Sequence, residues 1–426
     1  MSLFVIITFL ALAFLGMPLA FSLGVAAMTG LWLADIDLLM LPPQLMNAIN
    51  SFPLMSIPLF MIAGELMLKG GIMERLVDFA NAFIGRVRGG LAQVTIVAGA
   101  GLASVSGAAV ADASALSSTL VPSLKKQYGL GFSTGLVAAA ANLGPIIPPS
   151  GAMIVYAFMA GSSVSVGGMF MSGVVPGLIL FASFMVLCWF IAWKRDYPLA
   201  GQPVTLPAIL RELRRSFIVF LMPVIVIGGI VAGVFTPTEG AAVGVCYALF
   251  LGFFVTRRLR LADLPTVLLA AAKTSALVGA MIAFASTVTF LFTIDLLPMK
   301  LAALMQGITD SPFLFLCLIA LMLLVVGMFL ESNAAYIMLV PLFHPIALQY
   351  GIDPLHFGFL FVLNLVIGML TPPVGVVLFV VCSITGVRMG EPVRESWPFI
   401  AVMYAVLLLC MVFPGIVTWL PERLGY

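Results

Sequence analysis

Apolar runs long enough to cross a bilayer recur from one end of this 426-residue sequence to the other. A helical span needs about 20 mostly apolar residues. Here 63% of the residues are hydrophobic and only 8% are charged, and the mean hydropathy of +1.22 is far above that of soluble domains. Because the runs are continuous rather than alternating, they predict an all-α polytopic membrane protein and not a β-barrel. The first run is too long for a signal-peptide core, which predicts a retained first span.

Basic residues between the apolar runs indicate which loops lie in the cytoplasm. For the first half, 1–193, the sequence predicts spans at 3–33 and 52–68, a hairpin at 91–124, a broken helix at 131–161 and a span at 166–193. The segment 91–124 has basic residues at both ends and Gly107 near its middle. It is therefore predicted to be re-entrant, entering and leaving on the same side, with one full span as the alternative.

A polar and basic linker, 194–217, separates this half from a second, 218–426, and is expected on the cytoplasmic surface. For the second half the sequence predicts spans at 218–236, 239–256 and 265–297, a hairpin at 312–349, a broken helix at 355–383 and a span at 397–420. The flanks of 312–349 lack a basic excess, so this hairpin is expected to enter from the outside. The same assignment of basic loops to the cytoplasm places the N-terminus in the cytoplasm and the C-terminus in the periplasm.

The two halves contain similar sequence motifs in the same order. QYGL at 127–130 is followed by GPIIPPSG at 144–151, and QYGI at 349–352 is followed by GMLTPPVG at 368–375. Upstream, SGAA at 106–109 parallels SNAA at 332–335. Such paired, interrupted segments in two halves of opposite orientation are typical of secondary transporters, whose site lies at the repeat interface. The alternative, that Pro and Gly only kink packed helices, is weaker for two aligned breaks than for one.

The breaks themselves carry chemistry, because lipid cannot satisfy the backbone groups that an interrupted helix leaves free. Free carbonyl oxygens can ligate a small hard cation, and free N–H groups at a helix start can hold an anion. Hydroxyl and amide side chains nearby add neutral ligands without a fixed charge: Ser104, Ser106, Asn142, Ser150, Ser332, Asn333 and Thr371. This chemistry suits sodium and a carboxylate substrate.

Few charged or metal-ligating side chains lie within the apolar runs. The charged ones are Glu65, Asp112, Glu239, Lys273, Asp295 and Glu331. Asp112, five residues beyond the first predicted tip, is the best candidate for ligand contact near the site. A role in an internal hydrogen bond is equally compatible with its position. The five cysteines are far apart and form no CxxC pair, which favours buried thiols over disulfides or metal ligands.

At this point the chain resembles the large membrane (M) subunit of tripartite ATP-independent periplasmic (TRAP) transporters, within the ion-transporter superfamily. The stretches that carry the resemblance are SIPLFMIAGELMLKGGIMERLVDFA, GRVRGGLAQV, SGAAVADASALSSTLVP, LGPIIPPSG, VFTPTEGAAVGVCYAL, DPLHFGFLFVLNLVIGMLTPPVG and the closing WLPE. The resemblance implies a sodium-driven importer of organic acids in which a transport domain, built from both hairpins and both broken helices, moves like an elevator against a scaffold.

The resemblance also implies site residues. The first sodium site would use Ser104, Ser106, Gly107, Gly144, Ile146 and Pro149. The second would use Ser332, Asn333, Gly368, Leu370, Thr371 and Pro373. The substrate would lie between the tips, near Asn142, Ser150, Thr371 and Asp112. The chain departs from the family pattern at the first tip, where Ala108 replaces a common Ser, and at the second, which reads Glu331-Ser332-Asn333.

The implied partners are a periplasmic substrate-binding protein and a small four-helix membrane subunit on a separate chain, with Na⁺ as the coupling ion, no other metal, no cofactor and no nucleic acid. The implied location is a bacterial or archaeal inner membrane. C4-dicarboxylates, sialic acid, sugar acids and keto acids all fit as substrates. A channel lined by the broken helices is the alternative function. An enzyme is disfavoured, because no HExxH motif, GxGD pair or Ser–His constellation is found.

Overall fold

The computed structural model describes residues 1–84, 87–197, 199–200 and 206–426. It is helical almost throughout, with one antiparallel ribbon formed by β1 (Val87–Arg88) and β2 (Leu199–Ala200), in which Val87 pairs with Ala200. Among the described residues, seven helices are long and apolar enough to cross a membrane. The prediction of an all-helical membrane protein with several spans is therefore confirmed.

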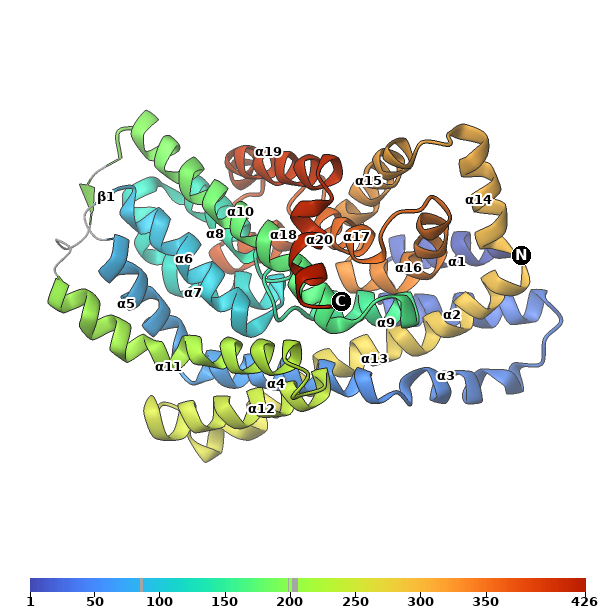
Figure 1. Cartoon of the computed structure of the whole chain (residues 1–426), viewed down its shortest axis with the longest axis horizontal. Helices are drawn as coiled ribbons and strands as arrows, with labels where there is room; N and C mark the ends of the chain where they lie inside the picture. The colour runs from blue at the N-terminus through green and yellow to red at the C-terminus, as the bar shows by residue number, and fades with distance from the viewer. Residues whose placement is uncertain (85–86, 198, 201–205) are drawn as a thin grey trace.

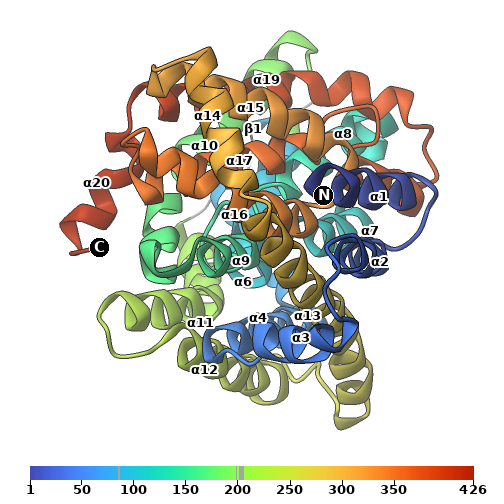
Figure 2. The same cartoon turned by 90° about the vertical axis from the view of Figure 1, so that its right-hand side faces the viewer.

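Long helices form a layer along one side of the molecule, at the lower edge in both views (Figures 1 and 2). This lower layer consists of α3 (Leu41–Ile49), α4 (Ser56–Lys69), α11 (Leu206–Val231), α12 (Pro237–Phe250) and α13 (Leu264–Ile294). The Thr238 hydroxyl donates to the Phe52 carbonyl over 3.0 Å, which ties α12 to the start of α4. Ser275 of α13 donates to the Met61 sulfur of α4 over 3.4 Å. The π-helical turn η4 (Leu251–Val255) extends α12, and α5 (Ile72–Ile84) packs against α11.

The stretch 3–33, predicted as one span, forms two helices instead. α1 (Ser2–Phe14) and α2 (Leu19–Leu33) pack against each other. The turn between them contains Gly16, at a φ of +87°, and Pro18, whose ring does not continue a helix. With 13 and 15 residues, these helices reach only about 20 and 22 Å, less than the roughly 30 Å of the hydrocarbon core. The single span is thus corrected to a short helical pair.

Both ends of this pair lie beside the C-terminal end of α13. The backbone N–H and the hydroxyl of Ser2 donate to Asp295 Oδ2 over 2.9 and 2.6 Å. Near the other end of the pair, Gly30 packs against Val5 and Leu291. The N-terminus therefore lies on the same side as the C-terminal end of α13, and this conflicts with the predicted cytoplasmic N-terminus if the next hairpin, 312–349, enters from the outside.

The predicted span 52–68 is preceded by helix that the sequence did not reveal. After η1 (Leu38–Met40), α3 is followed by the short η2 (Phe52–Met55) and then by α4. Figure 1 shows α3 and α4 following one another along α13. The α3–α4 segment is therefore as long as the helix that it accompanies.

The helices above the lower layer include two pairs with short non-helical tips. They are α6 (Gly90–Ser106) with α7 (Ala109–Tyr128), and α15 (Pro312–Phe329) with α16 (Ser332–Gln349). Two further helices are interrupted at tandem prolines. α8 (Leu130–Ala141) resumes as α9 (Gly151–Ala160), and α17 (Pro354–Gly368) resumes as α18 (Val376–Thr385). The tips and interruptions fall within the hairpins and broken helices that the sequence predicts.

The remaining helices are α10 (Val166–Lys194), α14 (Leu297–Ile308), α19 (Gly390–Val412) and α20 (Gly415–Arg423), with short turns η3 (Gly161–Ser163) and η5 (Leu261–Asp263). The predicted last span, 397–420, is corrected to two helices, because α19 ends just before Pro414. In the linker 194–217, residues 198 and 201–205 lie outside the described residues, and α11 already begins at Leu206. Arg195 anchors the start of the linker through a 2.7 Å ion pair with Glu395 of α19.

Candidate functional site

The first hairpin tip touches the first helix break directly. Gly107 has a φ of +62°, which favours glycine, and it ends α6. A Cβ at this position would lie 2.6 Å from the Pro149 carbonyl oxygen and 3.1 Å from the Cα of Ser150. The absence of a side chain therefore allows the backbone of the tip to approach the backbone of the break.

Asp112 lies behind this contact and is fully buried. Its Oδ1 accepts a hydrogen bond from the Ser106 hydroxyl. Its Oδ2 has no hydrogen-bond partner among the described residues, and a Cβ on Gly144 would lie only 2.5 Å from it. A buried carboxylate oxygen thus faces the backbone at the start of the first break.

The structure brings together four of the six residues predicted for the first sodium site, namely Ser106, Gly107, Gly144 and Pro149. The other two point elsewhere. The Ser104 hydroxyl donates to the Gly101 carbonyl of its own helix over 2.7 Å. The Ile146 carbonyl faces α10, since a Cβ on Gly173 would lie 2.7 Å from it.

The second tip is organised around Glu331, which caps α16. Its Oε1 accepts from Asn333 Nδ2 over 2.8 Å, and its Oε2 accepts from the Ala334 N–H over 3.4 Å. The backbone of α15 meets the second break, because a Cβ on Gly368 would lie 2.6 Å from the Cα of Gly327.

The remaining residues predicted for the second sodium site divide into buried and exposed ones. Thr371 and Leu370 are buried, and the Thr371 hydroxyl donates to the Ile367 carbonyl over 2.7 Å. Pro373 is exposed, whereas its counterpart Pro149 in the first break is buried. The two breaks therefore differ in how far they are covered.

The two breaks are linked by a hydrogen bond between the halves. Asn142 Nδ2 donates to the Val366 carbonyl over 2.9 Å across 224 positions of sequence. This separation equals the offset between the motifs at 144–151 and 368–375. Asn142 therefore contacts the position that matches it in the other half.

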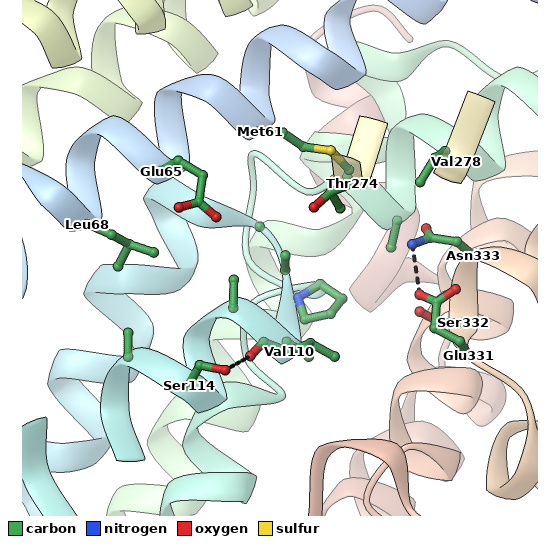
Figure 3. Close-up of a pocket in the computed structure, with 18 of the residues that line it drawn as sticks. Met61, Glu65, Leu68, Val110, Ser114, Thr274, Val278, Glu331, Ser332 and Asn333 are labelled. Carbon is green, nitrogen blue, oxygen red and sulfur yellow. Dashed lines mark hydrogen bonds between the residues drawn. The ribbon is translucent and has the colours of Figure 1, made fainter. Parts of the chain in front are cut away.

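A cavity of about 670 Å³ opens where both tips and both breaks meet the lower layer (Figure 3). Gly107 and Pro145 come from the first tip and break, while Ser332, Asn333 and Met369 come from the second. The opposite wall is formed by α4 and α13, with lining residues Ile57, Met61, Glu65, Leu68, Thr274 and Val278. The cavity therefore lies between the hairpins and broken helices on one side and the lower layer on the other.

None of the four residues predicted to bind substrate lines this cavity. Asp112, Asn142 and Ser150 are fully buried, and Thr371 is nearly so. Ser150 caps α9 and donates to the Pro145 carbonyl over 2.7 Å. These side chains lie in the layer behind the cavity wall.

The cavity walls also hold polar residues that the sequence analysis did not assign to a site. Figure 3 shows the carboxylates of Glu65 and Glu331 on opposite sides of the cavity. Ser114 and Thr274 add hydroxyl groups. The sequence marks Glu65 as unusual, because it is a charged residue within an apolar run. Its helix contains no break or repeated motif, so nothing in the sequence indicated that Glu65 lies near the tips.

The described residues contain no group of three or more His, Cys, Asp and Glu side chains that could hold a metal ion. Candidate cation ligands near the tips are therefore hydroxyl groups, backbone carbonyls and single carboxylates. Such oxygen ligands are those that hard cations prefer.

A helical membrane chain in which two tips and two helix breaks converge on a cavity has the architecture of a transport permease. The chain belongs to the family described as tripartite ATP-independent periplasmic transporter, DctM component, whose model matches residues 6–416. It is thus a transporter subunit and not an enzyme, and a multi-pass protein of the inner membrane.

Several curated relatives match over nearly their whole length. The chain is 38% identical over 425 residues to the sialic acid TRAP transporter large permease protein SiaM of Vibrio cholerae, covering 98% of each chain. It is 37% identical to the C4-dicarboxylate TRAP transporter large permease protein DctM of Pseudomonas aeruginosa, covering 95% of this chain and 94% of that one. It is 36% identical to the 2,3-diketo-L-gulonate TRAP transporter large permease protein YiaN of Escherichia coli, covering 95% of each.

Among solved structures, the chain resembles the YdaH transporter of Alcanivorax borkumensis with a TM-score of 0.64. The match covers 88% of each chain at 16% identity, and it therefore shows a likeness of fold alone.

Proposed function

We propose that this chain is the membrane permease of a sodium-coupled importer for an organic acid delivered by a periplasmic binding protein. The observation that carries the proposal is the single cavity on which both tips and both breaks converge. The relatives named above are permeases for sialic acid, C4-dicarboxylate and 2,3-diketo-L-gulonate, which are all organic acids. A small membrane subunit on a separate chain would complete the assembly.

The charges around the cavity support cation coupling. Glu65, Glu74 and Glu331 line it together with Lys69, so acidic side chains outnumber basic ones, and a carboxylate substrate would be repelled if no cation were bound. Two candidate sodium sites would lie nearby, one between the first tip and Gly144 and one at the second tip and the break that begins after Gly368. Sodium bound at these sites would offset the negative charge and so favour the entry of the anion.

The division of the molecule supports an elevator motion. The two hairpins and the two broken helices would form the transport domain, and the lower layer would form the scaffold. We take the halves to be inverted repeats, which would place the Asn142–Val366 contact close to a pseudo-twofold axis.

The basic residues support an orientation for this assembly. Lys69, Lys125 and Arg260 lie near the ends of α4, α7 and α12–η4 and would face the cytoplasm. The cavity extends along α4 toward Lys69 and Glu74, so it would open inward. The end of α13, and with it the N-terminus, would then lie on the periplasmic side, as would the C-terminus.

Reconstituted transport tests the proposal. Proteoliposomes holding this chain and its small subunit should take up an organic acid only with a sodium gradient and the loaded binding protein. Ser106→Ala and Asn333→Ala should each raise the sodium concentration for half-maximal uptake about tenfold, which corresponds to about 1.4 kcal/mol.

The matched control is Ser183→Ala, whose hydroxyl bonds only the Ile179 carbonyl of its own helix at 2.7 Å. It should behave like the parent protein. Sodium-independent uptake in the parent, or ion conduction without the binding protein, would favour the channel and contradict the proposal.

A further inference from the structure

A second cavity, of about 470 Å³, lies farther along α13 toward the end of that helix. Its lower-layer wall comes from α3 and α13, and its other wall comes from α9 and from Pro341 of α16. Like the first cavity, it therefore lies between the lower layer and the hairpins and broken helices, but farther along α13.

The lower-layer wall of this second cavity carries two stripes of uncharged polar side chains beside the apolar Ala48, Ile282 and Phe290. On α13, Ser286, Thr289 and Thr293 recur at the spacing of one helix face. On the neighbouring α3, Gln44 and Asn47, with the following Ser51, have a similar spacing. Two adjacent polar stripes would be unfavourable against lipid, and they indicate a surface that water or a polar solute contacts.

These polar groups are also available for bonding. The side chains of Gln44, Asn47, Ser286 and Thr289 make no hydrogen bond to another residue in the described part of the chain. Thr293 donates to the Thr289 carbonyl of its own helix over 2.9 Å. Hydroxyl and amide groups of this kind can donate to a carboxylate and exchange hydrogen bonds with hydroxyl groups.

Only one apolar layer separates the two cavities. On α13, Val278 lines the first cavity and Ile282, about one turn further, lines the second. On α9, Val155 lines the first cavity and Phe158 lines the second. Val155, Val278 and Ile282 are only 1%, 3% and 2% exposed, so they close the passage between the cavities.

We propose that the second cavity is the outer half of one solute route, whose inner half is the first cavity. Its solute-binding surface is the lower-layer wall, with Gln44, Asn47 and Ser51 from α3 and the turn after it and Ser286, Thr289 and Thr293 from α13. This inference rests on the transport function proposed above. It assigns these six residues to bind the carboxylate and hydroxyl groups of the solute when the tips lie at the outer level.

The geometry of α13 gives the distance involved. Thr274 faces the tips at the inner level, and Ser286 lies about 18 Å further along the helix at 1.5 Å per residue. A displacement of about that size would carry the tips from one polar level to the other, past the apolar layer.

Thiol modification tests the assignment. Thr289→Cys, in sealed vesicles with the periplasmic face outward, should react with the membrane-impermeant reagent 2-sulfonatoethyl methanethiosulfonate. Because the adduct fills the route, uptake should fall at least tenfold relative to the same variant before labelling, and a reducing agent should restore it. Ser286→Cys gives a second position on the same wall in case the first variant does not fold.

The matched control is Leu277→Cys, on an exposed face of α13 away from both cavities, since Leu277 is 48% exposed. Uptake by this variant, and by the parent with its own cysteines, should be unaffected by the reagent. Labelling confirmed by mass with full uptake, or no labelling from outside in a variant that transports, would overturn the inference. A parent protein that takes up no acid would instead contradict the proposed function, and labelling from outside would still decide whether the second cavity is open to the periplasmic side.

Discussion

Gly107 holds the first hairpin tip against the first helix break because it has no side chain. Its φ of +62° and the closeness of the Pro149 carbonyl both exclude a Cβ without rearrangement. The same principle holds at Gly368, against which Gly327 packs. At the scale of residues, the site therefore depends on backbone contacts that only glycine permits.

Gly107→Ala is expected to reduce uptake at least tenfold and to lower the melting temperature of the purified protein. The left-handed backbone alone costs about 1–2 kcal/mol for alanine, and the contact with Pro149 adds to this. Gly386→Ala is the matched control, because Gly386 has a φ of +70° and a ψ of 14° in the same left-handed region but no neighbour within 4 Å of an added Cβ. Equal effects of the two substitutions on uptake would contradict the role given to the contact.

The tip motifs located three residues that line the cavity, Gly107, Ser332 and Asn333. Their role as sodium ligands stays a prediction. Glu65 and Thr274 were not assigned, because the face that an unbroken helix turns toward the site depends on which helices pack together. The direction of the Ile146 carbonyl was also beyond the sequence, since it depends on backbone torsions within the break.

At the scale of elements, the α1–α2 pair shows how a continuous apolar run can hide a turn. The run 3–33 has the length and hydropathy of a span, and only Gly16 and Pro18 interrupt its pattern. The hairpins and broken helices were easier to place, because each carries a repeated motif. The amphipathic α3 carries no such motif and was missed.

The attachment of α1 to the end of α13 should depend on pH. Hydrogen bonds from Lys300 and from Ser2 hold the pKa of the Asp295 carboxyl well below its usual range. A carboxylate with a depressed pKa stabilises the fold fully above its unfolded value of about 3.9, and this contribution is lost as the pH falls through the folded value. The protection factors of the α1 amides, taken against intrinsic exchange at each pH, should therefore fall below about pH 4.

Asp295→Asn should show low protection factors in α1 at every pH tested, with little pH dependence of the protection. Asp310→Asn, at an exposed position in the loop before α15, serves as the control and should retain the parent's pH dependence. Exchange in α1 that remains slow in Asp295→Asn would show that this carboxylate does not hold the helix.

At the scale of the whole molecule, the described chain has two parts with a cavity between them. Its helical membrane class and its family were predicted correctly from the sequence, because composition and motifs spread over the whole chain carry that information. The inverted orientation of the halves and the sodium sites stay predictions. The orientation depends on how distant segments are arranged, and the sodium sites depend on bound ions. Neither the sequence motifs nor the similarity to relatives establishes these features.

The position of the N-terminus tests the arrangement of the whole chain in the membrane. A short epitope fused before Met1 should be reached by antibody from the periplasm without permeabilising the inner membrane, because Ser2 contacts Asp295 at the end of α13 that is proposed to face the periplasm. An epitope inserted after Gln202, in the basic linker, should be reached only after permeabilisation. An N-terminal epitope that reacts only in permeabilised cells would overturn the assigned sidedness.

The hydrogen bond between Asn142 and Val366 also bears on how the two halves of the chain are related. When two identical subunits pair about a twofold axis, the same position of each copy meets at the centre of a self-complementary interface. The bond joins two positions 224 residues apart that match in the repeated motifs, with both partners supplied by one polypeptide. If the proposed inverted repeat holds, the middle of the protein resembles the contact surface of a homodimer of half-length chains, in which one half contributes an amide side chain and the other a peptide oxygen.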